Sequence, residues 1–139
     1  MQANMTEHAS RAVLVVDDDD DYRSILKDIL NLRRPDIEVL EARDGLEALT
    51  LLGRLPRRPA VVFMDLEMPR LDGGGTVRRI RQDSRLNRLA VLILSSQSVE
   101  NQRRATDSAA DGYIAKSAAI DQLDRLVEMA GEYCDAAAV

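Results

Sequence analysis

The chain has 139 residues, of which 45% are hydrophobic and 31% are charged, and its formal net charge is −5. These values are typical of one globular domain with a single core, and they exclude a disordered chain. No apolar run approaches the roughly 18 residues of a membrane span, the polar start is no secretory signal, and a single cysteine excludes an internal disulfide, so we expect a cytoplasmic protein without a membrane partner.

Five short runs have the composition of β-strands. Most are continuously apolar, as in strands buried on both faces. In chain order they are AVLVV at 12–16, IEVLEA at 37–42, VVFM at 61–64, LAVLIL at 89–94 and GYIAK at 112–116. Residues 1–10, which include the only histidine, are expected to form a polar tail.

Helical patterns separate these strands. Apolar residues recur at helical spacing over 22–30, 46–52, 77–80 and 120–134. The segment 98–110 is helix-like but poor in large apolar residues, so we expect it to be weakly anchored. Gly73, Gly74 and Gly75 open the third helix, and each costs about 1 kcal/mol relative to alanine within a helix. We therefore expect a loose first turn there.

The alternation of strands and helices predicts one α/β domain over residues 11–132. We expect a doubly wound, flavodoxin-like (βα)5 fold, with a five-stranded parallel sheet in the order 2-1-3-4-5. Right-handed connections would place two helices on one face and three on the other. A short tail at 133–139 would end the chain, without an output domain.

Polar residues follow four of the five predicted strands. Asp17 and Asp18 follow the first, Asp65 the third, Ser95 the fourth, and Lys116 ends the fifth. In a parallel sheet these strand ends share one edge, and the switch point of this strand order lies between the first and third strands. We therefore expect these five side chains to converge.

Such a cluster has a definite chemistry. Three carboxylates in one pocket raise one another's pKa unless a cation is present, and oxygen ligands suit Mg²⁺. A lysine and a serine hydroxyl could bind an anion, so Asp65 could form an aspartyl phosphate. Taken singly, each residue has an ordinary alternative: a capping aspartate, a turn serine or a surface lysine.

Residues 11–132 resemble a response-regulator receiver domain of two-component signalling. The motifs that carry the resemblance are VLVVDD at 13–18, VVFMDLEMPRLDG at 61–73, VLILSS at 91–96 and GYIAK at 112–116. The resemblance implies that Asp65 accepts a phosphoryl group from a histidine kinase or a histidine phosphotransfer protein. It also implies a Mg²⁺ ion bound by Asp18 and Asp65 directly, by the backbone carbonyl of Glu67, and by Asp17 through water.

Further roles follow from the same resemblance. Lys116 would pair with the phosphoryl group, and Ser95 would move to bind it. Tyr113 would be the switch aromatic, while Glu67 and Gln97 would tune the lifetime of the phosphoryl group. The protein would be a stand-alone signalling switch, a monomer or weak dimer. It would act through the surface of the fourth helix, fifth strand and fifth helix, and would catalyse only its own phosphotransfer and slow autodephosphorylation.

The sequence departs from the family pattern at two places. Ser117 replaces the proline that usually follows the lysine, so we expect a trans peptide bond there. The glycine triplet at 73–75 replaces larger residues.

Three other readings are less well supported. An FMN-binding flavodoxin would need a Ser/Thr/Gly-rich phosphate loop after the first strand, where five aspartates stand. A haloacid-dehalogenase-type phosphatase would need an aspartate in place of Glu67. A receiver-shaped module that works without phosphorylation would not need all of the polar set at the strand ends. The acidic chain has no basic stripe or aromatic platform, so we expect no nucleic-acid partner.

Overall fold

One parallel sheet organises the chain. The computed structural model describes residues 9–95, 100, 103–104, 109–117 and 119–137. Within them the sheet has the order β2-β1-β3-β4-β5, which confirms the predicted fold class. The strands are β1 (Ser10–Val16), β2 (Glu38–Ala42), β3 (Pro59–Asp65), β4 (Val91–Ser95) and β5 (Gly112–Ala115).

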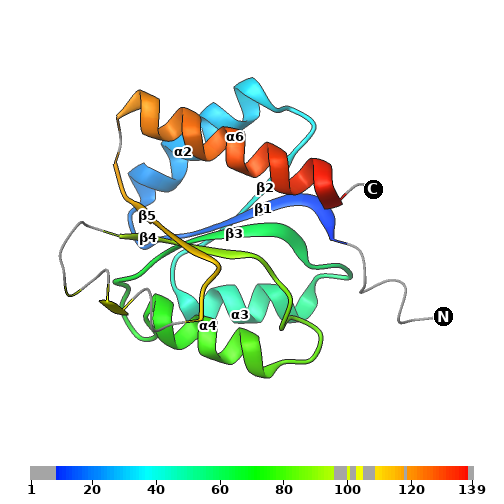
Figure 1. Cartoon of the computed structure of the whole chain (residues 1–139), viewed down its shortest axis with the longest axis vertical. Helices are drawn as coiled ribbons and strands as arrows, with labels where there is room; N and C mark the ends of the chain where they lie inside the picture. The colour runs from blue at the N-terminus through cyan, green and yellow to red at the C-terminus, as the bar shows by residue number, and fades with distance from the viewer. Residues whose placement is uncertain (1–8, 96–99, 101–102, 105–108, 118, 138–139) are drawn as a thin grey trace.

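Helices cover both faces of this sheet (Figure 1). The helices α2 (Asp20–Arg33) and α6 (Ile120–Ala137) lie on one face, and α3 (Gly45–Arg54) and α4 (Gly73–Gln82) lie on the other. The predicted helix over 98–110 lies mostly outside the described residues. Within it, Glu100, Arg103 and Arg104 are described and are helical. The predicted third helix on one face therefore stays a prediction.

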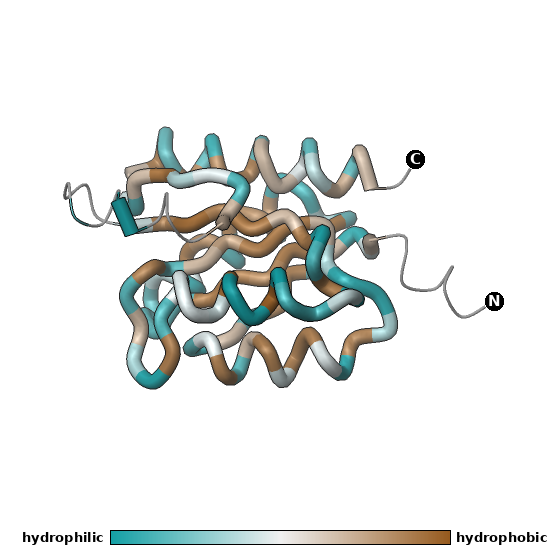
Figure 2. The backbone as a smooth tube through the Cα atoms, turned by 60° about the horizontal axis from the view of Figure 1, so that its bottom comes forward, coloured by the Kyte–Doolittle hydropathy of each residue, from teal (hydrophilic) through white to brown (hydrophobic). Residues whose placement is uncertain are grey.

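Alternate residues of the central strands build two cores. In β3, Val61 and Phe63 face α2 and α6, whereas Val62 and Met64 face α3 and α4. All four side chains have no exposed surface. Burial on both faces explains why the strands are continuous apolar runs, which appear brown between the helix layers in Figure 2.

Element boundaries differ from the expectation at both ends. The strand β1 begins at Ser10, whose backbone N–H donates to the carbonyl of Arg58 at 2.9 Å. Helix α6 continues through Ala137, past the expected start of the tail at 133. The helix continues because Cys134 is fully buried and Asp135 lies 2.9 Å from Arg34 and 3.0 Å from Arg11.

The expected loose first turn of the third helix is wrong. Helix α4 begins at Gly73, and all three glycines are buried. The carboxylate of Asp72 accepts a hydrogen bond from the N–H of Gly75 at 2.7 Å and so caps the helix. At Gly73 a side chain is excluded because a Cβ atom would meet the backbone of Asp65 and Leu66 at the end of β3.

Among the described helices, none is both long enough and apolar enough to cross a membrane.

Candidate functional site

Three carboxylates meet at the carboxyl ends of β1 and β3. Asp17, Asp18 and Asp65 each place one oxygen atom within 4.8 Å of the others. Asp17 and Asp65 are buried, with 1% and 9% of their surface exposed, whereas Asp18 is exposed. The N–H of Asp17 extends the sheet by donating to the carbonyl of Ala42 at 3.1 Å. The strand ends thus hold two of the three acids rigidly.

The charge of this cluster is poorly compensated. Burial, and then the charge of Asp17, raises the pKa of Asp65 to about 7, although nearby Lys116 opposes the shift. Asp65 also accepts a hydrogen bond from the backbone N–H of Glu67, which lowers its pKa. The remaining shift shows that the protein alone does not fully stabilise a charged Asp65. A cation would do so.

The donor set fits a hard divalent cation. All the side-chain donors are carboxylate oxygens, the ligands that Mg²⁺ prefers. The Oδ2 atom of Asp17 is buried. It has a close ion pair with Lys116 but retains lone pairs for a metal. The residues present therefore suit Mg²⁺.

Lys116 enters the site from the end of β5. Its Nζ atom lies 2.6 Å from Oδ2 of Asp17 and 3.6 Å from Oδ2 of Asp65. Burial lowers the pKa of Lys116, but the contact with Asp17 and the charge of Asp65 outweigh it, so the pKa is raised overall. The lysine stays cationic and contacts both acids.

Ser117, and not a proline, follows Lys116 at the end of β5. The N–H of Lys116 donates to the carbonyl of Ser95 at 2.8 Å, which holds its backbone to β4. Among the described residues no peptide bond is cis, which confirms the expected trans bond before Ser117. The hydroxyl of Ser117 accepts a hydrogen bond from the N–H of Ala119 at 3.1 Å and forms a local turn.

Ser95 ends β4 beside the acids. Its side chain is 2% exposed, and its hydroxyl has no hydrogen-bond partner within the described ranges. A buried hydroxyl costs free energy unless it forms a hydrogen bond, so this one is ready to donate to an anion.

The other predicted residues lie around this cluster. Tyr113 is half-buried in β5 and packs against the core on the α3 and α4 side. Glu67 is exposed in the loop after β3. Gln97 lies outside the described residues, so its predicted role stays a prediction.

The sequence reading missed Tyr22 and Arg23. Arg23 is buried and donates to the backbone carbonyl of Asp17 at 2.6 Å, while also pairing with Glu41. Burial, followed by the charges of Asp17 and Asp65, raises the pKa of Tyr22 to about 12. Their place in the first helical turn after the acidic run was the available signal.

The loop after Asp65 is anchored by a second contact that was not anticipated. Arg70 has a φ of 69° and places its guanidinium on the carboxylate of Asp44, with Nε 3.0 Å from Oδ2. Asp44 is buried and also caps α3 by accepting from the N–H of Glu47 at 2.9 Å. The ion pair therefore joins the loop to a helix end.

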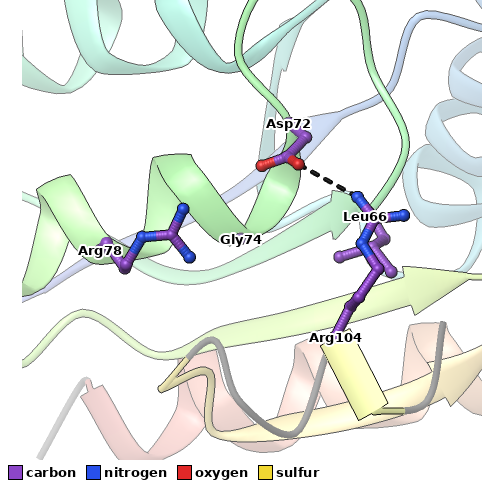
Figure 3. Close-up of a pocket in the computed structure, with 5 residues that line it drawn as sticks. All are labelled: Leu66, Asp72, Gly74, Arg78 and Arg104. Carbon is purple, nitrogen blue, oxygen red and sulfur yellow. Dashed lines mark hydrogen bonds and ion pairs between the residues drawn. The ribbon is translucent and has the colours of Figure 1, made fainter. Parts of the chain in front are cut away.

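A separate polar pocket of about 250 Å³ lies beside α4 (Figure 3). Its lining residues are Leu66, Asp72, Gly74, Arg78 and Arg104. Arg104 reaches toward Asp72, with a nitrogen 3.0 Å from the carboxylate (Figure 3). None of the three clustered acids lines this pocket.

The sequence matches a known protein family. The family model described as the response regulator receiver domain matches residues 13–128. The chain is 37% identical over 112 residues to the response regulator MprA of Mycobacterium sp. (strain KMS), covering 80% of this chain and 46% of the relative. It is 38% identical over 105 residues to a protein-glutamate methylesterase/protein-glutamine glutaminase of Pyrococcus abyssi, covering 75% and 28%. The chain thus spans less than half the length of these curated relatives.

Solved structures give the same result. The phosphorylated cyanobacterial phytochrome response regulator RcpA has a TM-score of 0.77 at 28% identity, covering 90% of this chain and 94% of RcpA. The chemotaxis response regulator CheY4 of Vibrio cholerae has a TM-score of 0.73 at 26% identity, covering 88% and 98%. The Mn²⁺-bound response regulator Rcp1 has a TM-score of 0.71 at 25% identity, covering 85% and 89%.

Proposed function

Because this chain belongs to the response regulator receiver domain family, we propose that Asp65 accepts a phosphoryl group from a histidine kinase or a histidine phosphotransfer protein, in a reaction that requires Mg²⁺. The main support is the cluster itself: Asp17 and Asp18 lie beside Asp65, with Lys116 3.6 Å from its carboxylate. Phosphorylation then switches the protein between two signalling states.

In this proposal Asp18 and Asp65 bind the metal directly, together with the backbone carbonyl of Glu67, and Asp17 binds it through water. When bound there, Mg²⁺ would supply positive charge that offsets the charges of the carboxylates and of the phosphoryl oxygens. The free lone pairs on the buried Oδ2 of Asp17 and the raised pKa of Asp65 support this assignment.

The residues of this chain then perform the transfer. A carboxylate oxygen of Asp65 attacks the phosphorus, a P–O bond forms, and the P–N bond to the donor histidine breaks. Lys116 binds one phosphoryl oxygen through its ammonium, and the free hydroxyl of Ser95 donates to another. In the reverse step water attacks the phosphorus of the acyl phosphate, the P–O bond to Asp65 breaks, and inorganic phosphate leaves.

The switch follows from the movement of Ser95 toward the phosphoryl group. Tyr113 lies two residues along β5 from Ala115, which is the register partner of Ser95, so movement at Ser95 reaches it through neighbouring strands. Tyr113 then turns inward and changes the surface of β5, α6 and the segment 98–110 for a downstream protein. Glu67 and Gln97 set how long the phosphoryl group lasts. The protein acts in the cytoplasm, as a monomer or weak dimer.

A phosphorylation assay with a small donor tests the proposal. Acetyl phosphate with Mg²⁺ should add one phosphoryl group, measured by intact mass, and EDTA should prevent it. Asp65→Asn should abolish the modification, whereas Asp28→Asn, at an exposed position of α2, should leave it unchanged. If acetyl phosphate and a panel of purified histidine kinases all fail to modify the wild type, the proposal is wrong, and a module that works without phosphorylation is favoured.

A further inference from the structure

The aromatic ring of Tyr22 lies under the ammonium group of Lys116. The Nζ atom is 4.7 Å from the ring centroid, which is within the range of a cation–π interaction. Tyr22 stands in the first turn of α2 and is 5% exposed. A residue far away in the sequence thus contacts the one lysine of the site.

The lysine needs such a contact because its backbone anchor does not fix its side chain. The hydrogen bond to Ser95 holds only the main chain at the end of β5, and the turn at Ser117 lies beyond it. The four-carbon stem of a lysine has several free torsions. Two groups hold the ammonium of Lys116 close to Asp65: the carboxylate of Asp17 and the face of Tyr22.

These two contacts respond differently to a metal ion. Mg²⁺ at the acidic cluster would draw on the charge of Asp17 and weaken its pairing with the lysine. The ring of Tyr22 carries no charge and is no ligand for Mg²⁺, so its contact with the ammonium would persist.

We propose that Tyr22 is a positioning residue for Lys116, whose ring keeps the ammonium within reach of the phosphoryl group on Asp65 after Mg²⁺ has engaged Asp17. This inference rests on the proposed function of Asp65. The ring carries the role, because the hydroxyl of Tyr22 is buried and has no hydrogen-bond partner within the described residues. Phenylalanine at position 22 should therefore still hold the ammonium of Lys116 in place, whereas an aliphatic residue should not.

Tyr22 is also part of the core between the sheet and the helices α2 and α6. A loss of packing could slow phosphorylation without any effect on Lys116, so the experiment must separate the two. Tyr133 offers a matched control, because it is a partly buried tyrosine that packs against the same core, on α6. We would compare Tyr22→Phe, Tyr22→Leu and Tyr133→Leu in the full chain.

The position of the lysine can be measured directly. The chain has only two lysines, Lys27 and Lys116, so selective ¹³C labelling of the lysine ε-methylene gives two signals. The ring of Tyr22 should shift the Lys116 signal upfield in the wild type and in Tyr22→Phe. The shift should be lost in Tyr22→Leu and unchanged in Tyr133→Leu. Lys27 serves as an internal reference.

The rate of phosphorylation by acetyl phosphate at saturating Mg²⁺ is the second measurement. We expect Tyr22→Leu to slow it by about three- to tenfold, the scale of a partly desolvated cation–π contact. Tyr22→Phe should stay within about twofold of wild type, and Tyr22→Leu should bind Mg²⁺ within about twofold of wild type.

Equal rates in Tyr22→Leu and wild type would overturn the proposal. Equal slowing in Tyr22→Phe and Tyr22→Leu, or an unchanged Lys116 shift in Tyr22→Leu, would also overturn it. If the wild type is not phosphorylated at all, the proposed function fails instead. The methylene shift still reports on the contact in that case, so the two failures are distinguishable.

Discussion

Gly73 packs directly on the backbone of Asp65. A Cβ atom at Gly73 would lie 2.5 Å from the carbonyl oxygen of Asp65 and 3.0 Å from the Cα of Leu66. Both neighbours are backbone atoms, so they cannot rotate away. The N–H of Gly73 also donates to the carbonyl of Leu66 at 2.8 Å, which fixes the contact. The first turn of α4 thus supports the strand end that carries Asp65.

Gly73→Ala should therefore destabilise the protein and disturb the site. The new methyl group forces α4 away from β3, and overpacking of this kind costs about 1–3 kcal/mol in the free energy of unfolding. Urea unfolding would measure the loss. Phosphorylation by acetyl phosphate should also slow, because the backbone of Asp65 and Leu66 must move.

Gly53→Ala is the matched control for this prediction. Gly53 lies in α3, and a Cβ atom there would meet nothing within 4 Å. Alanine favours a helix over glycine by up to about 1 kcal/mol, so this variant should be as stable as wild type or more stable. Equal stability of Gly73→Ala and Gly53→Ala would contradict the proposed support of β3 by α4.

These two glycines also show what a sequence can and cannot predict. Helix propensity treats Gly53 and Gly73 alike, whereas their neighbours in space differ completely. The strand order and the meeting of Asp17, Asp18 and Asp65 were predictable, because apolar runs and the rules of parallel sheets determine which strand ends are adjacent. The buried first turn of α4 was not, because it depends on how closely a helix approaches the sheet.

Side-chain direction was a second limit. The sequence indicated that Lys116 would lie near the acids, but not that it would contact Asp17 more closely than Asp65. Arg23 looked like one of many surface arginines, yet it is buried against the carbonyl of Asp17. Periodicity places a residue on a face of a helix and says nothing about which polar atom it reaches.

Asp65→Asn should stabilise the metal-free protein. The substitution removes one negative charge from a buried group of carboxylates while keeping the shape of the side chain. In EDTA near neutral pH, we expect the free energy of unfolding to rise by about 1–3 kcal/mol. Added Mg²⁺ should stabilise the wild type more than the variant. Asp28→Asn should change neither value, and a less stable Asp65→Asn would refute the prediction.

Lys116→Met should strengthen Mg²⁺ binding while slowing phosphorylation. The ammonium lies 2.6 Å from Asp17 and competes with the metal for that carboxylate. Its removal should tighten Mg²⁺ binding by about three- to tenfold, measured by titration calorimetry. Lys27→Met is the control, because Lys27 lies on α2 and its ammonium pairs with Glu41 at 3.2 Å. Weaker Mg²⁺ binding by Lys116→Met would show that the lysine does not compete.

The ion pair between Asp44 and Arg70 should make stability depend on acid pH. The hydrogen bond from the N–H of Glu47, and then the guanidinium of Arg70, lower the pKa of Asp44 below its usual 3.8. A carboxyl whose folded pKa is depressed stabilises the protein above its unfolded pKa, and the contribution is lost as pH falls through the folded value.

Asp44→Asn keeps a capping oxygen but loses the charge. Near pH 6 the variant should be less stable than wild type by about 1 kcal/mol, and the difference should shrink as the pH falls below the usual carboxyl pKa. Asp36 also has a lowered pKa, because of Arg34 and Arg11, but it is present in both proteins and cancels in the comparison. Urea unfolding of both proteins across this range measures the difference. A gap that stays constant as the pH falls would mean that the charge of Asp44 does not hold the loop after Asp65.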